Sequence, residues 1–122
     1  MSQVNKDSLT SALLASFLKE KGYTVTSNSR LKGLSGITHE IAILTKINEK
    51  KIGFDFTKSS QVDELLRFFA KSIDLPEVQL YLLLEKKKLE KFSFLKNSPK
   101  IIAFESTEDL LAKVEKIVES KI

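Results

Sequence analysis

Apolar residues recur at intervals of three and four positions in three segments of the chain, 9–20, 62–73 and 110–118. This spacing predicts helices that each bury one face. The candidate capping residues are Asn5, Asp7 or Ser8 for the first helix, Ser59 or Ser60 for the second, and Ser106 or Thr107 for the last. Gly22 and the Leu75-Pro76 pair are expected to end the first two helices. The predicted core stripe of the second helix is Val62, Leu65, Leu66, Phe69 and Ile73.

Alternating or continuous apolar residues between these segments predict strands. The predicted strands are Tyr23–Thr26, Ile37–Ile47, Ile52–Phe56, Val78–Leu84 and Lys100–Phe104. The second and third form a hairpin around a turn at residues 48–51, and a polar loop is expected at Ser27–Ser35. Val78–Leu84 is a nearly continuous apolar run, which suits a central strand covered on both faces.

The order of these elements indicates the fold class. With a short charged helix at Glu85–Lys91, the order is α-β-β-β-α-β-(α)-β-α. An antiparallel meander followed by strand–helix–strand units predicts an α/β protein with a mixed sheet flanked by helices. The length predicts a single domain over residues 1–122.

Composition narrows the choice of function. The chain has no cysteine, which excludes disulfides, zinc–thiolate sites and thiol catalysis. It has no apolar run of spanning length and no apolar signal core, so we expect a soluble cytoplasmic protein that does not enter a membrane. The net charge of +4 permits contact with nucleic acid, and the abundance of Lys and Glu without Cys or Trp is typical of a thermophile.

Three short motifs resemble one family of nucleases. Lys21–Val25 (KGYTV) is similar to a Gly-Tyr/Phe-x-Val motif, and Ser35–Ile43 (SGITHEIAI) to Ser-Gly-x-x-His-Glu-Ile-Asp-Val. Gly53–Ser60 (GFDFTKSS) is similar to Val-Val-Glu-Val-Lys-Ser-Ser. Together with the element order, these motifs resemble the restriction-endonuclease-like PD-(D/E)xK superfamily, nearest its Mrr-like and archaeal Holliday-junction-resolvase branches.

The resemblance implies where a metal-dependent active site would lie. In active members, an Asp on the second strand and a Glu on the third hold a divalent metal, and a Lys two residues further on assists the attacking water. These positions fall on Ala42, Phe56 and Lys58, so only the lysine is kept. The resemblance therefore implies a catalytically degenerate, nuclease-like module without a metal cofactor. Its expected partners are DNA or a nuclease or repair protein, and it is expected to form a homodimer.

Two alternatives remain open. The chain could be a Mg²⁺- or Mn²⁺-dependent endonuclease with a shifted site, in which Glu40 and Asp55 hold the metal and Lys58 is catalytic. Strand alternation places Asp55 and Lys58 on opposite faces, so this arrangement needs a bulge near Gly53. The other alternative is a structural assembly subunit that associates through a hydrophobic helix or a sheet edge.

The candidate nucleic-acid contacts are three cations, Arg30, Lys32 and Lys58. Arg30 and Lys32 lie beside Gly33 in the predicted loop and could bind phosphate, with a solvated loop as the alternative. Lys58 could equally form a salt bridge with an acid at the start of the second helix. His39, the single histidine, is typical of a hydrogen-bonded structural residue rather than a metal ligand or a base.

Overall fold

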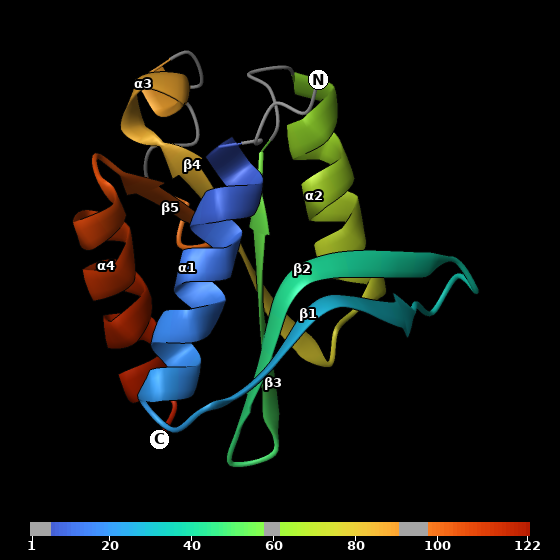
Figure 1. Cartoon of the computed structure of the whole chain (residues 1–122). Helices are drawn as coiled ribbons and strands as arrows, with labels where there is room; N and C mark the ends of the chain where they lie inside the picture. The colour runs from blue at the N-terminus through green and yellow to red at the C-terminus, as the bar shows by residue number, and fades with distance from the viewer. Residues whose placement is uncertain (1–5, 58–61, 91–97) are drawn as a thin grey trace, which may run out of the picture.

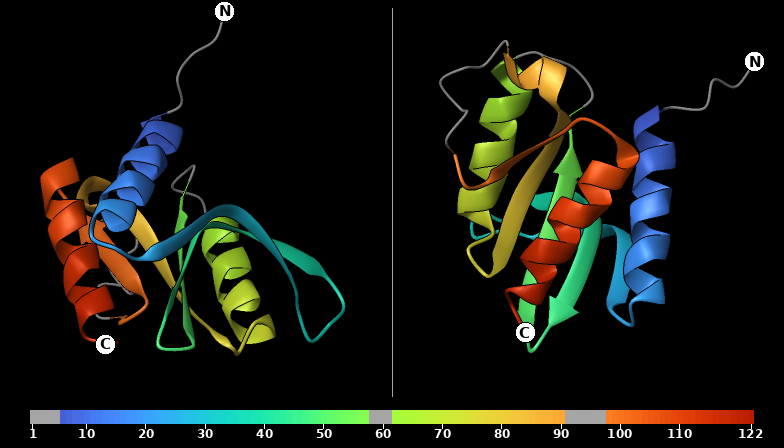
Figure 2. Two further views of the ribbon diagram at one scale, coloured as in Figure 1. Left: turned by 60° about the horizontal axis from the view of Figure 1, so that its bottom comes forward. Right: turned by 90° about the vertical axis from the view of Figure 1, so that its left-hand side faces the viewer.

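The computed structural model describes residues 6–57, 62–90 and 98–122 as one sheet with helices on both faces (Figures 1 and 2). The elements are α1 (Lys6–Glu20), β1 (Thr24–Lys32), β2 (Thr38–Ile47), β3 (Lys50–Phe56), α2 (Val62–Asp74), β4 (Val78–Glu85), α3 (Lys86–Leu89), β5 (Ile101–Phe104) and α4 (Thr107–Glu119). The sheet order is β1-β2-β3-β4-β5. The first three strands are antiparallel, and β4 and β5 run parallel to β3. The predicted fold class and element order are confirmed.

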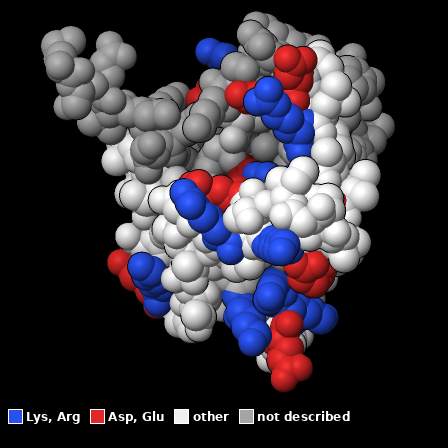
Figure 3. Space-filling model, turned by 90° about the vertical axis from the view of Figure 1, so that its right-hand side faces the viewer, with Lys and Arg blue, Asp and Glu red and all other residues white. Residues whose placement is uncertain are grey.

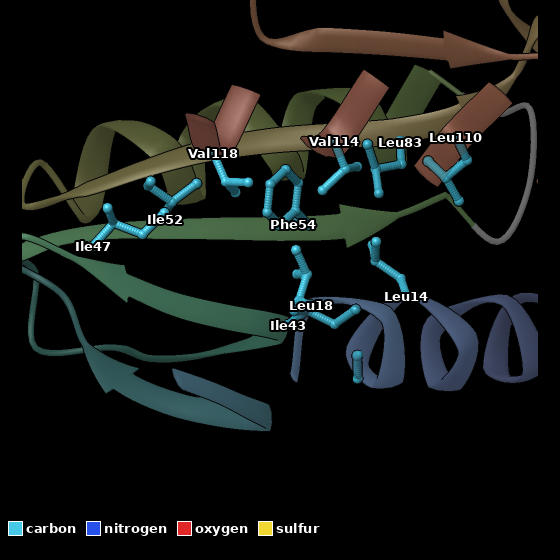
Figure 4. Packing of buried hydrophobic residues seen from close by; sticks show 11 residues of the cluster. Leu14, Leu18, Ile43, Ile47, Ile52, Phe54, Leu83, Leu110, Val114 and Val118 are labelled. Atoms are coloured by element: carbon cyan, nitrogen blue, oxygen red, sulfur yellow. The ribbon is translucent and has the colours of Figure 1, made fainter. Parts of the chain in front are cut away.

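Helices α1 and α4 lie side by side on one face of the sheet (Figure 2). Their fully buried residues include Leu14 and Leu18 of α1 and Val114 and Val118 of α4. Phe54 of β3 lies in the middle of this cluster, between the two helices (Figure 4). Because burying one such side chain contributes about 1.5–3 kcal/mol, this cluster supplies much of the stability of the fold.

Helix α2 covers the opposite face. Leu65 and Phe68 of α2, and Leu75 just after it, pack against alternate residues of β4, which are Val78, Leu80, Leu82 and Leu84. The intervening residue Leu83 packs on the α1–α4 face. Strand β4 is therefore covered on both faces, which confirms the interpretation of its continuous apolar run.

Strand pairing is interrupted at one level of the sheet. Asn28 of β1 has a left-handed backbone (φ 51°), and the pairing of β1 with β2 skips the step between Asn28 and Ala42. The last pair between β2 and β3 is Ile43 opposite Phe54, so the pairing stops just before Ala42 is reached. Beyond this level, residues 29–41 form a hairpin, called the arm below, that bends away from the sheet toward α2 (Figure 1).

Gly53 makes room for this bend. A Cβ atom at Gly53 would lie 2.8 Å from Cδ1 of Leu80, 3.1 Å from Cγ2 of Ile41 and 3.2 Å from Cγ1 of Val78. Ile41 belongs to the arm, and it is fully buried against the α2 face of the sheet. The absence of a side chain at Gly53 therefore allows the arm to pack onto β3 and β4.

Two sequence predictions about these elements are wrong in part. The segment Ser27–Ser35 is a loop only from Gly33 onward, because β1 continues to Lys32. Strand β1 is a half-exposed edge strand, so its polar residues do not prevent pairing with β2.

The buried stripe predicted for α2 is confirmed at Leu65 and at the partly buried Phe69, and it is wrong at Val62, Leu66 and Ile73. This helix carries apolar residues at helical spacing in two registers, and periodicity alone cannot choose between them. The core takes Leu65, Phe68, Ser72 and Leu75, while Val62, Leu66 and Ile73 are exposed. The buried hydroxyl of Ser72 is satisfied by the ammonium group of Lys100, at 2.6 Å.

Several predicted helix boundaries are confirmed. Gly22 has a left-handed backbone (φ 93°) just after α1, and α2 ends directly before Leu75-Pro76. Ser106 caps α4, since its side chain accepts a hydrogen bond from the amide of Asp109 at 3.1 Å. The candidate caps Asn5, Ser59 and Ser60 lie outside the described residues.

We predict that Gly53→Val lowers the free energy of unfolding by about 1–3 kcal/mol, because the new side chain overpacks the contact between the arm and the sheet. Urea denaturation measures this change. Gln79→Val is the control, because Gln79 is exposed on β4 next to the same strand. Equal stabilities of the two variants would contradict this account of Gly53.

Candidate functional site

An open pocket of about 650 Å³ lies where β2 and β3 separate, between α1 and α2. Its walls are Ser11, Ala12, Ser27, Asn28, Glu40, Ala42, Asp55, Phe56, Thr57, Glu64, Arg67, Phe68, Lys71 and Leu82. Figure 3 looks onto the side of α2 and the arm and shows a hollow in which acidic and basic side chains meet. The pocket therefore has acidic, basic and apolar residues in its walls, and it lies where the pairing of the strands is interrupted.

Asp55 is the buried carboxylate of this pocket. Its side chain is only 11% exposed, and both of its oxygens are engaged. The amide of Ala42 donates a hydrogen bond to Oδ1 at 3.0 Å, and the ammonium group of Lys71 lies 2.8 Å from Oδ2. The amide of Ala42 therefore donates its hydrogen bond to this carboxylate at the point where β2 and β3 stop pairing.

Lys71 of α2 joins three elements at one point. Besides its ion pair with Asp55 of β3, its ammonium group donates a 2.7 Å hydrogen bond to the backbone carbonyl of Glu40 on β2. The side chain of Lys71 is 21% exposed, so the pair is partly shielded from solvent. Lys71 therefore fixes the base of the arm to α2 and to the sheet.

The pocket-facing side of α2 follows a helical pattern. Glu64, Arg67 and Lys71 are spaced three and four residues apart and all line the pocket. The sequence analysis did not identify this polar stripe, although the spacing of three and four residues between its charged positions could have revealed it. Thr57 was also missed. It lies two residues after Asp55, is 5% exposed, and its hydroxyl has no hydrogen-bond partner in the described part of the chain.

Asp74, at the end of α2, holds the tip of the arm. Its carboxylate accepts hydrogen bonds from the amide of Ser35 at 2.8 Å and from the Ser35 hydroxyl at 2.7 Å. Nε2 of His39 lies 2.7 Å from the same carboxylate. A side chain at Gly33 would collide with Asp74, so glycine is required at this close approach. The prediction that His39 is a hydrogen-bonded structural residue agrees with this contact.

The sequence-predicted site residues divide into three groups. Glu40 and Asp55, the candidate metal ligands, both line the pocket. Arg30 and Lys32 are exposed on β1 and do not line the pocket. Lys58, the candidate catalytic residue and third candidate nucleic-acid contact, lies outside the described residues.

Two neighbouring residues of β3 have different surroundings. Phe56 packs partly against the α1–α4 core, whereas Asp55 lies beside Ala42. Asp55 is one residue before the position to which the resemblance assigned the metal-binding Glu, and Thr57 stands two residues after Asp55. No bulge occurs at Gly53, which pairs regularly with Leu44 and Leu80.

The described residues hold no group of three or more His, Cys, Asp or Glu side chains arranged to bind a metal ion. Asp55 has both oxygens occupied by protein partners, which leaves Glu40 as the other candidate ligand from the sequence. A divalent metal at this place would compete with Lys71 for the carboxylate of Asp55.

Several solved structures resemble this fold. Can2 from Sulfobacillus thermosulfidooxidans, in complex with cyclic tetra-adenylate, gives a TM-score of 0.65 at 12% identity over 92% of this chain and 36% of that chain. An XisH family protein from Nostoc punctiforme gives 0.56 at 16% identity, over 82% and 94%. A protein of unknown function, AF1548, gives 0.51 at 15% identity, over 79% and 56%.

The fold is restriction-endonuclease-like. These identities show a shared fold alone, and the chain spans about a third of Can2 and about half of AF1548. No family model matches the sequence, and no curated protein matches it. None of the helices in residues 6–57, 62–90 and 98–122 is long and apolar enough to cross a membrane.

The hydrogen bonds that anchor the arm predict how the Asp74 carboxyl responds to low pH. The hydrogen bonds from the Ser35 hydroxyl and then from His39 hold the pKa of the Asp74 carboxyl below its usual value of 3.8. A carboxyl with a lowered folded-state pKa stabilises the fold above the unfolded-state value, and this contribution is lost as the pH falls through the folded-state pKa.

In an NMR titration, we therefore expect the Ser35 amide to report a midpoint below 3.8 for Asp74. The midpoint should move up toward 3.8 in Ser35→Ala, because the main hydrogen bond to the carboxylate is removed. Glu77→Gln, an exposed change just after α2, should leave it unmoved. A midpoint at or above 3.8 in the wild type would contradict the anchoring role of Asp74.

Proposed function

We propose that this chain is a nucleic-acid-binding module built on the restriction-endonuclease-like fold, without metal-dependent cleavage. The observation that carries the proposal is the ion pair between Asp55 and Lys71. It stands where the resemblance to the PD-(D/E)xK nucleases implies a metal, and Ala42 replaces the second acid beside it.

The nature of the ion pair supports a binding role over a catalytic one. Mg²⁺ and Mn²⁺ need free carboxylate oxygens, whereas each oxygen of Asp55 already accepts a hydrogen bond. The position two residues after Asp55 holds Thr57, which has no charge to place beside a scissile phosphate.

Cations on the arm supply a surface for the phosphate backbone. Arg30 and Lys32 are two residues apart on β1, so they point to the same side of the arm. Arg30 lies directly opposite Glu40, and Glu40 lines the pocket. A line of cations therefore leads from the pocket edge along the arm, while Arg67 and Lys71 lie inside the pocket. Phosphate contacts of this type give affinity without sequence readout.

The binding test uses fluorescence anisotropy with duplex, single-stranded and four-way-junction DNA at about 50 and 200 mM salt. We expect binding at the lower salt that weakens steeply at the higher salt. Arg30→Ala combined with Lys32→Ala should lower the slope of log affinity against log salt by about two, because two phosphate contacts are lost.

The matched control is Lys87→Ala combined with Lys116→Ala. It removes the same charge from exposed positions on α3 and α4, which lie on the opposite side of the molecule from the arm (Figure 1). Failure of the wild type to bind any of these DNAs at low salt would overturn the proposal. Equal effects of the two double variants would overturn the role of the arm.

A second candidate function is a Mg²⁺- or Mn²⁺-dependent endonuclease. It is favoured by the presence of Glu40, Asp55 and Lys71 in one pocket, since a lysine from α2 would supply the positive charge that Thr57 lacks. Incubation of supercoiled and junction DNA with Mn²⁺ separates the two functions. The binding module leaves the DNA intact, whereas cleavage that disappears in Asp55→Ala and Lys71→Ala would establish the enzyme. Lys58→Ala tests the candidate from the sequence in the same assay.

A further inference from the structure

The tip of the arm, residues 33–37, exposes two large apolar side chains. Leu34 is 79% exposed and Ile37 is 60% exposed. The tip joins β1 to β2 and projects past α2 at the far right of Figure 1, and the left-hand view of Figure 2 shows the same projection. Turns are usually built from Gly, Pro, Asn, Asp and Ser, so neither apolar residue is needed to form this one. The two side chains are therefore candidates for contact with a partner.

The backbone of the tip is held firmly. Every amide of residues 33–37 donates a hydrogen bond. Three of these bonds close within the tip, and the other two go to Asp74 at the end of α2. The Asp74 carbonyl accepts from Leu34 at 3.0 Å, and the Asp74 carboxylate accepts from Ser35 at 2.8 Å. Because the tip is already ordered, a partner that binds it removes little further conformational freedom.

The charges around the tip select the kind of partner. Lys32 adjoins the tip, Arg30 lies two residues further back on the same side of β1, and both are exposed. The carboxylate that contacts the tip, that of Asp74, is occupied by Ser35 and His39. Figure 3 looks onto this side of the molecule and shows Lys and Arg side chains bordering an area without charge. An apolar apex bordered by cations fits a polyanion with an apolar interior, and duplex DNA has this character.

We propose that Leu34 is an apolar wedge that enters the minor groove of duplex DNA and inserts between two base pairs. The inference rests on the proposed function, because it needs the arm to bind DNA, and it adds how the tip of the arm does so. Two-stranded ribbons enter the grooves of DNA in several classes of protein. Apolar side chains that insert from the minor groove unstack a base step and kink the duplex. A firmly held ribbon with Leu34 at its apex has the form that this requires.

The spacing between Leu34 and the cations matches the minor groove. Cα atoms two residues apart are separated by at most about 7 Å, and the minor groove is about 7.5 Å deep. With Leu34 at the base pairs, Lys32 would therefore lie near the phosphates at the rim of the groove. Arg30, two residues further back, would lie over the sugar–phosphate backbone. Insertion of Leu34 is thus compatible with the phosphate contacts of the proposed function.

Insertion predicts a preference for DNA that is easy to unstack. Separating a base step costs free energy, and the cost is smallest where a mismatch already weakens the stack. We therefore expect a duplex with one mismatch to bind about tenfold more tightly than the same duplex fully paired. Phosphate contacts cannot produce this difference, because the two duplexes carry the same charge.

Two measurements test the wedge. Fluorescence anisotropy with the two duplexes at about 50 mM salt gives the preference, and an adenine analogue that fluoresces when unstacked, placed beside the mismatch, reports insertion. We expect the wild type to show the preference and to raise the emission. Leu34→Ser should lose both but bind the paired duplex within about twofold of the wild type, because the phosphate contacts remain. The control Ile122→Ser, at a 72% exposed apolar residue outside the arm, should keep both. Circular dichroism confirms that each variant is folded.

The outcomes distinguish the wedge from DNA binding as such. Binding without a preference for the mismatch, or without a rise in emission, would overturn the wedge and leave the proposed function standing. Equal weakening of both duplexes by Leu34→Ser would do the same, because Leu34 would then be a general contact. Netropsin, which fills the minor groove of A·T-rich DNA, should suppress the rise on such a duplex, and a rise that persists would contradict entry from this groove. Failure of the wild type to bind either duplex would overturn the proposed function and the wedge together.

Discussion

The ion pair between Asp55 and Lys71 is the interaction on which the shape of this molecule depends. Ladder pairing between β2 and β3 ends at Ile43 and Phe54, and the next amide, that of Ala42, bonds to the Asp55 carboxylate. Lys71 neutralises this carboxylate and bonds to the carbonyl of Glu40. A buried charge without its partner is costly, so the two residues are required together. Their network replaces the missing ladder and sets the angle at which the arm leaves the sheet.

The bend, the pocket and the exposed apolar surface follow from this arrangement. The left-handed Asn28 and the side-chain-free Gly53 allow the arm to bend, and Asp74 fixes its tip. Helix α2 then presents three different sides. One packs in the core, a second carries Glu64, Arg67 and Lys71 into the pocket, and the third exposes Val62, Leu66 and Ile73.

The sequence predicted the architecture well because it depends on local patterns. The hairpin, the continuous apolar strand and the cap at Ser106 each have a signal within a few residues. The side of α2 that enters the core could not be chosen, since two registers of apolar residues have nearly the same spacing. The role of Lys71 was missed for a different reason. Its partner is 16 positions away on another element, and no local pattern connects a helix lysine to a strand carboxylate.

A double-mutant cycle on Asp55 and Lys71 tests the central claim most directly. Urea denaturation would measure the free energy of unfolding for Asp55→Asn, Lys71→Met and the double variant. We predict that Lys71→Met alone costs about 3–5 kcal/mol, because it leaves a buried carboxylate unpaired. The double variant should cost clearly less than the sum of the two single changes. Small and additive effects would contradict the claim that this pair holds the arm, the helix and the sheet together.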